Sequence, residues 1–248
     1  MKIAFITAMP EEFRAVTGCL DGHSTFRIGS FKACRGTASG HDIAVIESGM
    51  GFTNATIATE KLIGEVGPDL IISAGYCGGI APILGVGDVV VATRVVIVSG
   101  GSFEEVPVEL ATAGYSFVAS KSTSGHRVFG GMYVNTPKIM EKARISAMLP
   151  IDASHPVVEM ESAAIALIAT ENKVPFIGIR SVSDPAGEEL GFSLDEFCDS
   201  QMRIRISRVL LTIIRKPGII PQLVRLARNS RIAGANLTRA VEKFLAFV

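Results

Sequence analysis

The sequence predicts a single α/β domain with a central, mostly parallel (mixed) twisted sheet flanked by helices. Short apolar runs alternate with segments of helical length, which is the pattern of strands and helices packed in layers. No internal repeat, low-complexity tract or linker divides the chain. With 248 residues, 48% hydrophobic and 19% charged, the chain is long and apolar enough to bury one large core.

The first third of the chain predicts strands and helices in alternation. An apolar run at 3–7 is followed by Pro10-Glu11-Glu12, and proline and acids both favour the first turn of a helix. The elements expected next are a polar hairpin at 27–39, a strand at 42–48, a glycine turn at 49–51 and a helix at about 53–66.

The rest of the chain continues the alternation, with glycines where strands are expected to end. The expected strands are 69–74 before a loop at 75–79, 88–98, 126–129 before a glycine turn, and 175–183. The expected helices are 137–147, 194–214 and 221–247, the last two separated by a break at 216–218, and the segment 100–124 is expected to be a loop or mobile flap.

Charge is distributed unevenly although the formal net charge is zero. Residues 201–248 hold ten Lys or Arg and one acid, which leaves 14 basic and 23 acidic residues before them. We therefore expect a catalytic domain at 1–216 and a basic amphipathic helical extension at 217–248. The preferred interpretation packs this helix on the acidic body or on a partner subunit, with weak membrane-surface contact as the alternative. Nucleic-acid binding is a third interpretation of the basic segment, but no interleaved aromatic residues support it.

Cofactor and metal chemistry have no support in the residue pattern. The four cysteines are scattered without the close spacing of metal or redox sites, so we expect no metal, no cofactor and reduced thiols. Neither GxGxxG nor GxxxxGK[ST] occurs. The apolar run after Met1 is short for a signal segment, and no run approaches the roughly 18 residues of a membrane span, so we expect a cytoplasmic protein.

Four acids stand at positions where burial needs a reason. Glu159 and Glu161 interrupt an apolar run that extends from 157 to 168, while Glu12 and Asp184 follow the carboxyl ends of predicted strands. Burying an ionised acid costs several kcal/mol unless partners compensate. In open α/β sheets, ligands bind at this edge. The alternatives are an acid at a helix start for the glutamates and a helix cap for Asp184.

Five motifs together resemble the nucleoside phosphorylase/nucleosidase superfamily, and most closely its methylthioadenosine/S-adenosylhomocysteine nucleosidases. The resemblance covers roughly residues 1–202, and the motifs occur in the order and at the approximate spacing found in the family. The motifs are Ile6-Thr7-Ala8-Met9-Pro10-Glu11-Glu12, Ser48-Gly49-Met50-Gly51, Gly75-Tyr76-Cys77-Gly78-Gly79, Val158-Glu159-Met160-Glu161 and Ser183-Asp184.

The resemblance implies cleavage of the N-glycosidic bond of a purine nucleoside. Asp184 would protonate the purine at N7, and Glu12 would take a proton from the attacking water. Glu161 would accept hydrogen bonds from the ribose hydroxyls, with Met160 packed beneath it. The other expected base and sugar contacts are Cys77, Gly78, Tyr133 and Ser183. Glu159 is expected to be structural, and Tyr133 has a core-edge position as its alternative.

Hydrolysis is favoured over phosphorolysis because acids and apolar residues occupy the places where a phosphate would need cations. Arg180 and Arg127 keep phosphorolysis open. The resemblance also implies a homo-oligomer, a dimer. Three differences from the family's pattern leave the 5′ substituent of the nucleoside undetermined. They are Tyr76 in place of a small residue, Gly187 in place of an acid, and a short 100–124 segment. Methylthioadenosine, S-adenosylhomocysteine, a futalosine-type nucleoside and a lipid nucleoside such as adenosylhopane remain, as does a nucleoside-binding protein without turnover.

Overall fold

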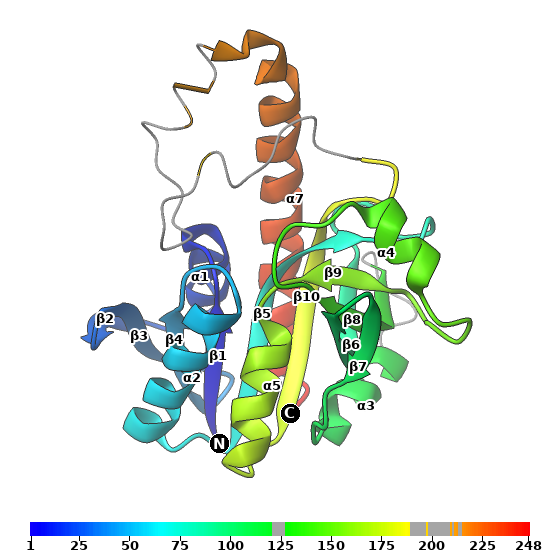
Figure 1. Ribbon diagram of the computed structural model, residues 1–248. Helices are drawn as coiled ribbons and strands as arrows, with labels where there is room; N and C mark the ends of the chain where they lie inside the picture. The colour runs from blue at the N-terminus through cyan, green and yellow to red at the C-terminus, as the bar shows by residue number, and fades with distance from the viewer. Residues whose placement is uncertain (121–126, 189–196, 198–208, 210, 213–214) are drawn as a thin grey trace.

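The computed structural model describes residues 1–248 except 121–126, 189–196, 198–208, 210 and 213–214 (Figure 1). Its centre is one sheet, and the described strands are β1 (Lys2–Thr7), β2 (His23–Ile28), β3 (Phe31–Ala38), β4 (His41–Glu47), β5 (Leu70–Gly79), β6 (Val89–Ser99), β7 (Ser102–Glu105), β8 (Val128–Asn135), β9 (Val157–Glu159) and β10 (Phe176–Asp184). The described helices include α1 (Pro10–Thr17), α2 (Phe52–Val66), α3 (Thr112–Ser120), α4 (Lys142–Met148), α5 (Ser162–Glu171) and α7 (Ile220–Leu245).

The sheet closes on itself around β5. Strand β5 pairs with β10, β10 with β6, β6 with β8, β8 with β9, and β9 with the end of β5, so these strands form a ring. Strands β1, β4, β3 and β2 extend the sheet from the other part of the same β5 edge. Parallel and antiparallel pairings are equally common among the described strands. The mixed sheet is therefore confirmed, but it is less parallel than expected.

Two apolar layers cover the sheet. Helices α2 and α5 pack into one core cluster through small residues such as Ala55, Ala58 and Ala163–Ala164. Helices α1, α3 and α7 pack into the second cluster, where the rings of Phe117 and Phe244 meet edge to face at 5.4 Å. The layers fix the sheet between helices, and the carboxyl ends of β1, β5 and β10 are left to meet at one edge.

Helix α7 differs along its length. Its second half is buried, with Ala233, Leu237, Val241 and Phe244 in the core. Its first half extends past the sheet (Figure 1). We expected 217–248 to be an extension, and the boundary at 216/217 remains a prediction. The packing nevertheless makes the second half of α7 part of the same core as α1 and β10.

Glycine-containing segments differ most from the expectations. The expected loop at 75–79 is the end of β5, and the expected turn at 130–131 is the middle of β8. Backbone pairing on both edges of these strands outweighs the low strand propensity of glycine. The hairpin begins at His23 rather than at 27, and α4 begins at Lys142 rather than at 137.

The described part of the expected flap at 100–124, residues 100–120, contains regular secondary structure. It contains β7, which pairs with the end of β6, and α3, which buries Phe117 completely. Because the segment is mostly polar, the sequence did not indicate that Phe117 would anchor it in the core. The expected strands at 3–7, 42–48, 88–98 and 175–183 and the helices at 53–66 and 221–247 are confirmed to within about two residues. The expected helix at 194–214 lies almost entirely outside the described residues.

Candidate active site

A cavity of about 1270 Å³ lies at the edge where β1, β5, β9 and β10 end. Residues at the ends of these strands and directly after them form its floor, and α4 and α7 form parts of its wall. All but one of the predicted site residues line it. These residues are Glu12, Cys77, Gly78, Met160, Glu161, Ser183 and Asp184.

Tyr133 is the exception, and its predicted contact with substrate is wrong. Its side chain is fully buried, and its hydroxyl donates a hydrogen bond of 2.6 Å to the carbonyl of Val90. A Cβ at Gly178 would lie 2.6 Å from the Tyr133 ring, so the glycine provides the space that the ring fills. Tyr133 therefore packs inside the ring of strands. This position is closer to the alternative expectation from the sequence, a core-edge aromatic residue, than to a substrate contact.

Glu12 is held by backbone donors from two segments. Its Oε2 accepts hydrogen bonds from the amides of Ala8 and Met9 at 2.7 and 2.9 Å, and its Oε1 accepts one from the amide of Tyr76 at 2.7 Å. The side chain is 2% exposed. Burial raises the pKa of Glu12, and Arg180 and the three amides oppose that rise. The carboxyl is thus fixed in orientation between the ends of β1 and β5.

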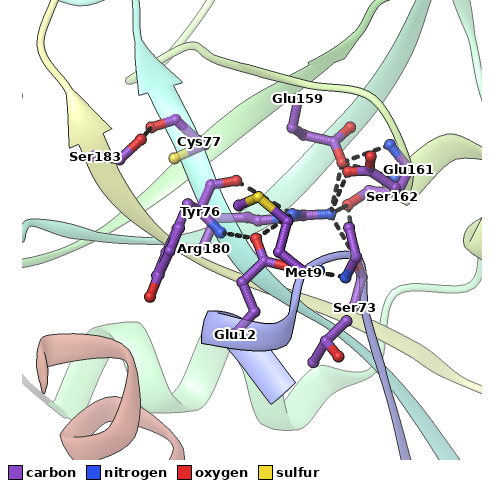
Figure 2. Close-up of polar contacts among 12 residues, drawn as sticks. Met9, Glu12, Ser73, Tyr76, Cys77, Glu159, Glu161, Ser162, Arg180 and Ser183 are labelled. Atoms are coloured by element: carbon purple, nitrogen blue, oxygen red, sulfur yellow. Dashed lines mark hydrogen bonds and ion pairs between the residues drawn. The ribbon is translucent and has the colours of Figure 1, made fainter. Parts of the chain in front are cut away.

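Arg180, on β10, connects the buried acids (Figure 2). Its Nη2 donates to Glu159 Oε2 at 2.8 Å and to Glu161 Oε2 at 3.3 Å, and its Nη1 lies 3.9 Å from Glu12 Oε1. Nη1 also donates to the carbonyl of Tyr76 at 3.1 Å. Although burial works in the opposite direction, the three glutamates raise the pKa of Arg180. The guanidinium is therefore the counterion of the whole group.

Glu159 and Glu161 have different hydrogen-bond partners, which the sequence alone did not reveal. Glu159 Oε2 accepts from the amides of Glu161 and Ser162 at 3.0 and 2.7 Å, which stabilises the start of α5, while Oε1 accepts from Asn135 at 3.1 Å. Glu161 Oε1 accepts from the amide of Gly51 at 2.8 Å. Burial, with Glu159 and Glu12 adding to it against Arg180, raises the pKa of Glu161 to about 7.

Two glycines of β5 make room for charged side chains. A Cβ at Gly75 would lie 2.5 Å from both Arg180 Nη1 and Glu12 Oε1. A Cβ at Gly78 would lie 3.0 Å from Asp184 Oδ2 and from Lys142 Cε. The glycine run that the sequence suggested as a ligand loop therefore also serves the close approach of ion pairs across a strand.

Asp184 lies at the opposite end of the floor, after a bulge in the β5–β10 pairing. Ser183 Oγ donates to its Oδ1 at 2.6 Å, and Lys142 Nζ lies 2.5 Å from its Oδ2. The carboxyl side chain is 25% exposed, and it borders the cavity. Asp184 can thus reach a bound ligand while both oxygens are held.

Helix α7 forms a wall of the cavity that the sequence did not predict. The residues that it contributes are mostly small or apolar, and they are Leu223, Leu226, Ala227, Ser230, Arg231, Gly234 and Thr238. A Cβ at Gly234 would lie 2.7 Å from the Tyr76 hydroxyl, so the helix and the tyrosine approach closely only because residue 234 is glycine. Tyr76, the departure seen in the sequence, is part of this contact.

Three other parts of the site escaped the sequence interpretation. Lys142 and the preceding segment with Thr136, Ile139 and Met140 line the cavity, although this stretch was expected to be ordinary helix. Arg180 was considered only as a phosphate ligand. A cation inside an apolar strand was the available signal, because such a charge needs partners in the fold.

Further observations concern other classes of site in the part of the chain that the structure describes. No group of three or more His, Cys, Asp or Glu side chains there is arranged so that it could hold a metal ion. Cys19, Cys34 and Cys77 are free thiols. Arg127 pairs with Asp88 and does not line the cavity. Among the described helices, none combines the length and apolarity needed to span a membrane.

The mixed sheet between helices, with acids grouped at its strand ends, defines an α/β scaffold with a candidate active site at that edge. The family model described as the phosphorylase superfamily matches residues 2–215, and the chain belongs to this family. The match ends before α7.

Curated relatives of this chain within the family are nucleosidases. The 5′-methylthioadenosine/S-adenosylhomocysteine nucleosidase of Bacillus cereus (strain G9842) is 32% identical over 213 residues, which are 80% of this chain and 92% of that protein. The nucleosidase of the same name from Bacillus thuringiensis subsp. konkukian matches with the same identity and coverage.

Solved structures agree on the fold. The nucleosidase of Neisseria meningitidis, in complex with methylthio-immucillin-A, superimposes with a TM-score of 0.75 at 24% identity, covering 100% of this chain and 99% of that one. The enzyme of Streptococcus pneumoniae, with a transition-state inhibitor, has a TM-score of 0.74 at 20% identity and covers 99% of both chains.

Proposed function

We propose that this protein is a purine nucleosidase that hydrolyses the N-glycosidic bond of an adenosine-type nucleoside, similar to methylthioadenosine or S-adenosylhomocysteine, to free base and sugar. The observation that carries the proposal is the division of three acids along one cavity. Glu12 and Glu161 share one buried cation, and Asp184 is separated from them at the partly exposed end of β10.

The chemistry follows from this division. Asp184 gives a proton to N7 of the purine while the bond between C1′ and N9 breaks and its electron pair moves to the base. The ribosyl carbon becomes positive, and Glu161 stabilises it by accepting hydrogen bonds from the ribose hydroxyls. Glu12 takes a proton from the water that attacks C1′. Acids in different surroundings can hold different protonation states at one pH.

The remaining cavity residues position the nucleoside. Met160, between Glu159 and Glu161, packs beneath the ribose. Cys77 and Gly78 present backbone at the end of β5 to the base, and Ser183 holds Asp184 through the hydrogen bond at 2.6 Å. No step requires a metal or cofactor.

Hydrolysis is preferred over phosphorolysis because three of the cations that line the cavity are already paired with acids. Arg180 serves the glutamates, Lys142 serves Asp184, and Arg14 pairs with Glu11. A phosphate opposite the base would meet the carboxylates of Glu12 and Glu161.

The test is incubation of the protein with methylthioadenosine, S-adenosylhomocysteine, inosine and futalosine, with and without phosphate, with base release followed by chromatography. We expect free adenine from an adenosine-type substrate without phosphate. Release only in the presence of phosphate would replace the hydrolase by a phosphorylase. A nucleoside that raises the melting temperature without any base release would indicate a binding protein.

A second substrate class is favoured by the wall that α7 forms. Leu223, Leu226 and Ala227 give the cavity an apolar side, and the volume exceeds the roughly 300–1,000 Å³ of ordinary ligand pockets. A nucleoside with a bulky apolar 5′ group, such as adenosylhopane, fits this side better than the amino-acid tail of S-adenosylhomocysteine. Comparing kcat/KM for methylthioadenosine and a lipid nucleoside would decide between them.

We also propose a cytoplasmic homodimer. Phe52 and Ile57 are partly exposed on α2, next to the Met50–Gly51 segment of the site, and would be covered by a second copy. Sedimentation velocity would test this, because a monomer at micromolar concentration would exclude the dimer.

Weak membrane-surface contact is proposed through the first half of α7. Val224 is 64% exposed and Ile220 is 45% exposed, and they lie among Arg225, Arg228 and Arg231. Basic and apolar side chains on one exposed helix favour anionic lipid surfaces. Co-sedimentation with vesicles containing phosphatidylserine should fall when Arg225 and Arg228 are replaced by Gln. Equal binding of both proteins would exclude this contact.

A further inference from the structure

We propose that Lys142 is a positioning residue for the glycosidic cleavage: it holds the carboxyl of Asp184, and the turn that follows it, in the orientation that protonates the leaving base. The inference rests on the proposed function, in which Asp184 is the acid.

The ammonium group of Lys142 is surrounded by oxygens of one short segment. Its Nζ lies 2.5 Å from Asp184 Oδ2 and donates to the carbonyls of Asp184 and Pro185 at 2.8 and 2.9 Å and to that of Glu188 at 3.3 Å. Four acceptors thus share three N–H groups. Lys142 therefore contacts both the side chain of Asp184 and the backbone of residues 184–188.

The two oxygens of Asp184 have different donors. Ser183 holds Oδ1 from the same strand, whereas Lys142 holds Oδ2 from α4, a separate element. The Lys142 contact therefore sets the rotation of the carboxyl relative to the cavity. Without it, Asp184 would retain a donor only from its neighbour in sequence.

The burial of Lys142 indicates a role beyond surface pairing. Its side chain is 10% exposed, and a lysine is rarely buried unless it is paired. The strand beside it is adapted to its presence, because a Cβ at Gly78 would contact Lys142 Cε and Asp184 Oδ2 at 3.0 Å. Both partners line the cavity, so a ligand base would lie next to this pair.

A purely structural clamp and a positioning residue lead to different results with different leaving groups. Purine departure needs protonation at N7. Nitrophenolate departs without a proton donor, so p-nitrophenyl β-D-ribofuranoside depends on the sugar end of the site alone. Loss of correct acid placement should affect only the first substrate, whereas general damage to the site should affect both.

The experiment compares Lys142→Met, Lys142→Arg and the control Arg144→Met, which removes an exposed cation from the same helix. We expect Lys142→Met to lower kcat for methylthioadenosine by about 10- to 100-fold, the cost of a misplaced catalytic group. KM should change by less than about threefold. Lys142→Arg should recover much of the loss by donating to the same oxygens, and Arg144→Met should match the wild type.

Two further readouts complete the test. Turnover of the nitrophenyl riboside by Lys142→Met should stay within about threefold of the wild type. In an Asp184→Asn background, adding Lys142→Met should change the residual rate little, because the lysine acts through the aspartate. Circular dichroism and melting curves verify that each variant is folded.

The inference is overturned if Lys142→Met keeps wild-type turnover of methylthioadenosine, if it loses activity on both substrates equally, or if the two substitutions reduce turnover independently. A wild-type protein that releases no base from any nucleoside overturns the proposed function instead, and the role of Lys142 with it.

Discussion

The two ends of the cavity floor hold their charges in different ways. At the end that we propose binds the sugar, called the sugar end, Glu12 and Glu161 are nearly inaccessible and accept hydrogen bonds from backbone amides of three segments, with Arg180 between them. The end with Asp184, which we propose binds the base, is called the base end. At the base end, Asp184 is a quarter exposed and is held by two side chains. The difference indicates that the sugar end is set by the fold itself, whereas the base end is adjustable without cost to the core.

The largest effect should come from removing the cation of the sugar end. Arg180→Met leaves three buried carboxylates without their counterion, and we expect a loss of about 3–5 kcal/mol in the free energy of unfolding. Urea unfolding measures this loss. The control is Arg127→Met, which removes a half-exposed partner of Asp88 and should cost about 1 kcal/mol or less. Equal stability of the two variants would contradict the comparison.

At the base end, an equally drastic change should affect turnover and leave stability almost unchanged. Asp184→Asn removes the acid and should lower kcat for adenine release by about 10²- to 10⁴-fold. Its melting temperature should stay close to that of the wild type, because the side chain is partly exposed. Asp152→Asn, an exposed acid that pairs with Arg94, serves as the control. Near-normal turnover would remove Asp184 from its assigned role.

The pH dependence of stability should identify the buried acids of the sugar end. Burial raises the pKa of Glu161 from 4.5 to about 7, so the folded protein binds this proton more tightly than the unfolded chain does. Its contribution to stability is therefore fully present below pH 4.5 and is lost as the pH rises through about 7. The free energy at stake is on the order of 3 kcal/mol.

The measurement is thermal unfolding between pH 4.5 and 8. Glu161→Gln cannot ionise, so the stability difference between variant and wild type should move in favour of the variant across this window and level off above it. A difference that stays constant with pH would contradict the assignment.

The two glycines of β5 offer the smallest and most direct comparison. Gly75→Ala places a Cβ 2.5 Å from Arg180 and Glu12, where surrounding groups are fixed, and should cost about 1–3 kcal/mol. Gly78→Ala places a Cβ 3.0 Å from Asp184, Lys142 and Val158, a milder overlap than at Gly75, and should cost less than about 1 kcal/mol while lowering kcat. Melting curves with initial rates separate the two, and a reversed order would reject the comparison.

The features predictable from the sequence were those with local signals. Apolar runs identified β1, β4, β6 and β10. Acids after predicted strands indicated Glu12 and Asp184, and acids inside an apolar run indicated Glu161; all three line the cavity, and their roles remain proposals. Strand β5 was cut short because its glycines have turn propensity, and only the pairing of β5 with β10 and β9 overrides it.

Contacts between distant segments were not predictable. The sequence places Lys142 and Asp184 42 positions apart, and nothing local links them. The amphipathic pattern of α7 indicated that one helix face would be buried, but not that Leu223 and Leu226 would face a ligand cavity. Tyr133 was misassigned because an aromatic residue near glycines has the same local pattern in a core as in a pocket.

Helix α7 connects the cavity to the hydrophobic core, so ligand binding and core stability are coupled through it. Phe244 is anchored in the core, and Leu226 borders the cavity on the same continuous helix. A ligand that packs against Leu226 binds the folded protein and not the unfolded chain, so occupancy at one end of the helix adds to the stability of the other. Amide protons near the carboxyl end of α7 should therefore exchange more slowly with solvent when a nucleoside with a large 5′ group is bound, although they are far from the reacting bond.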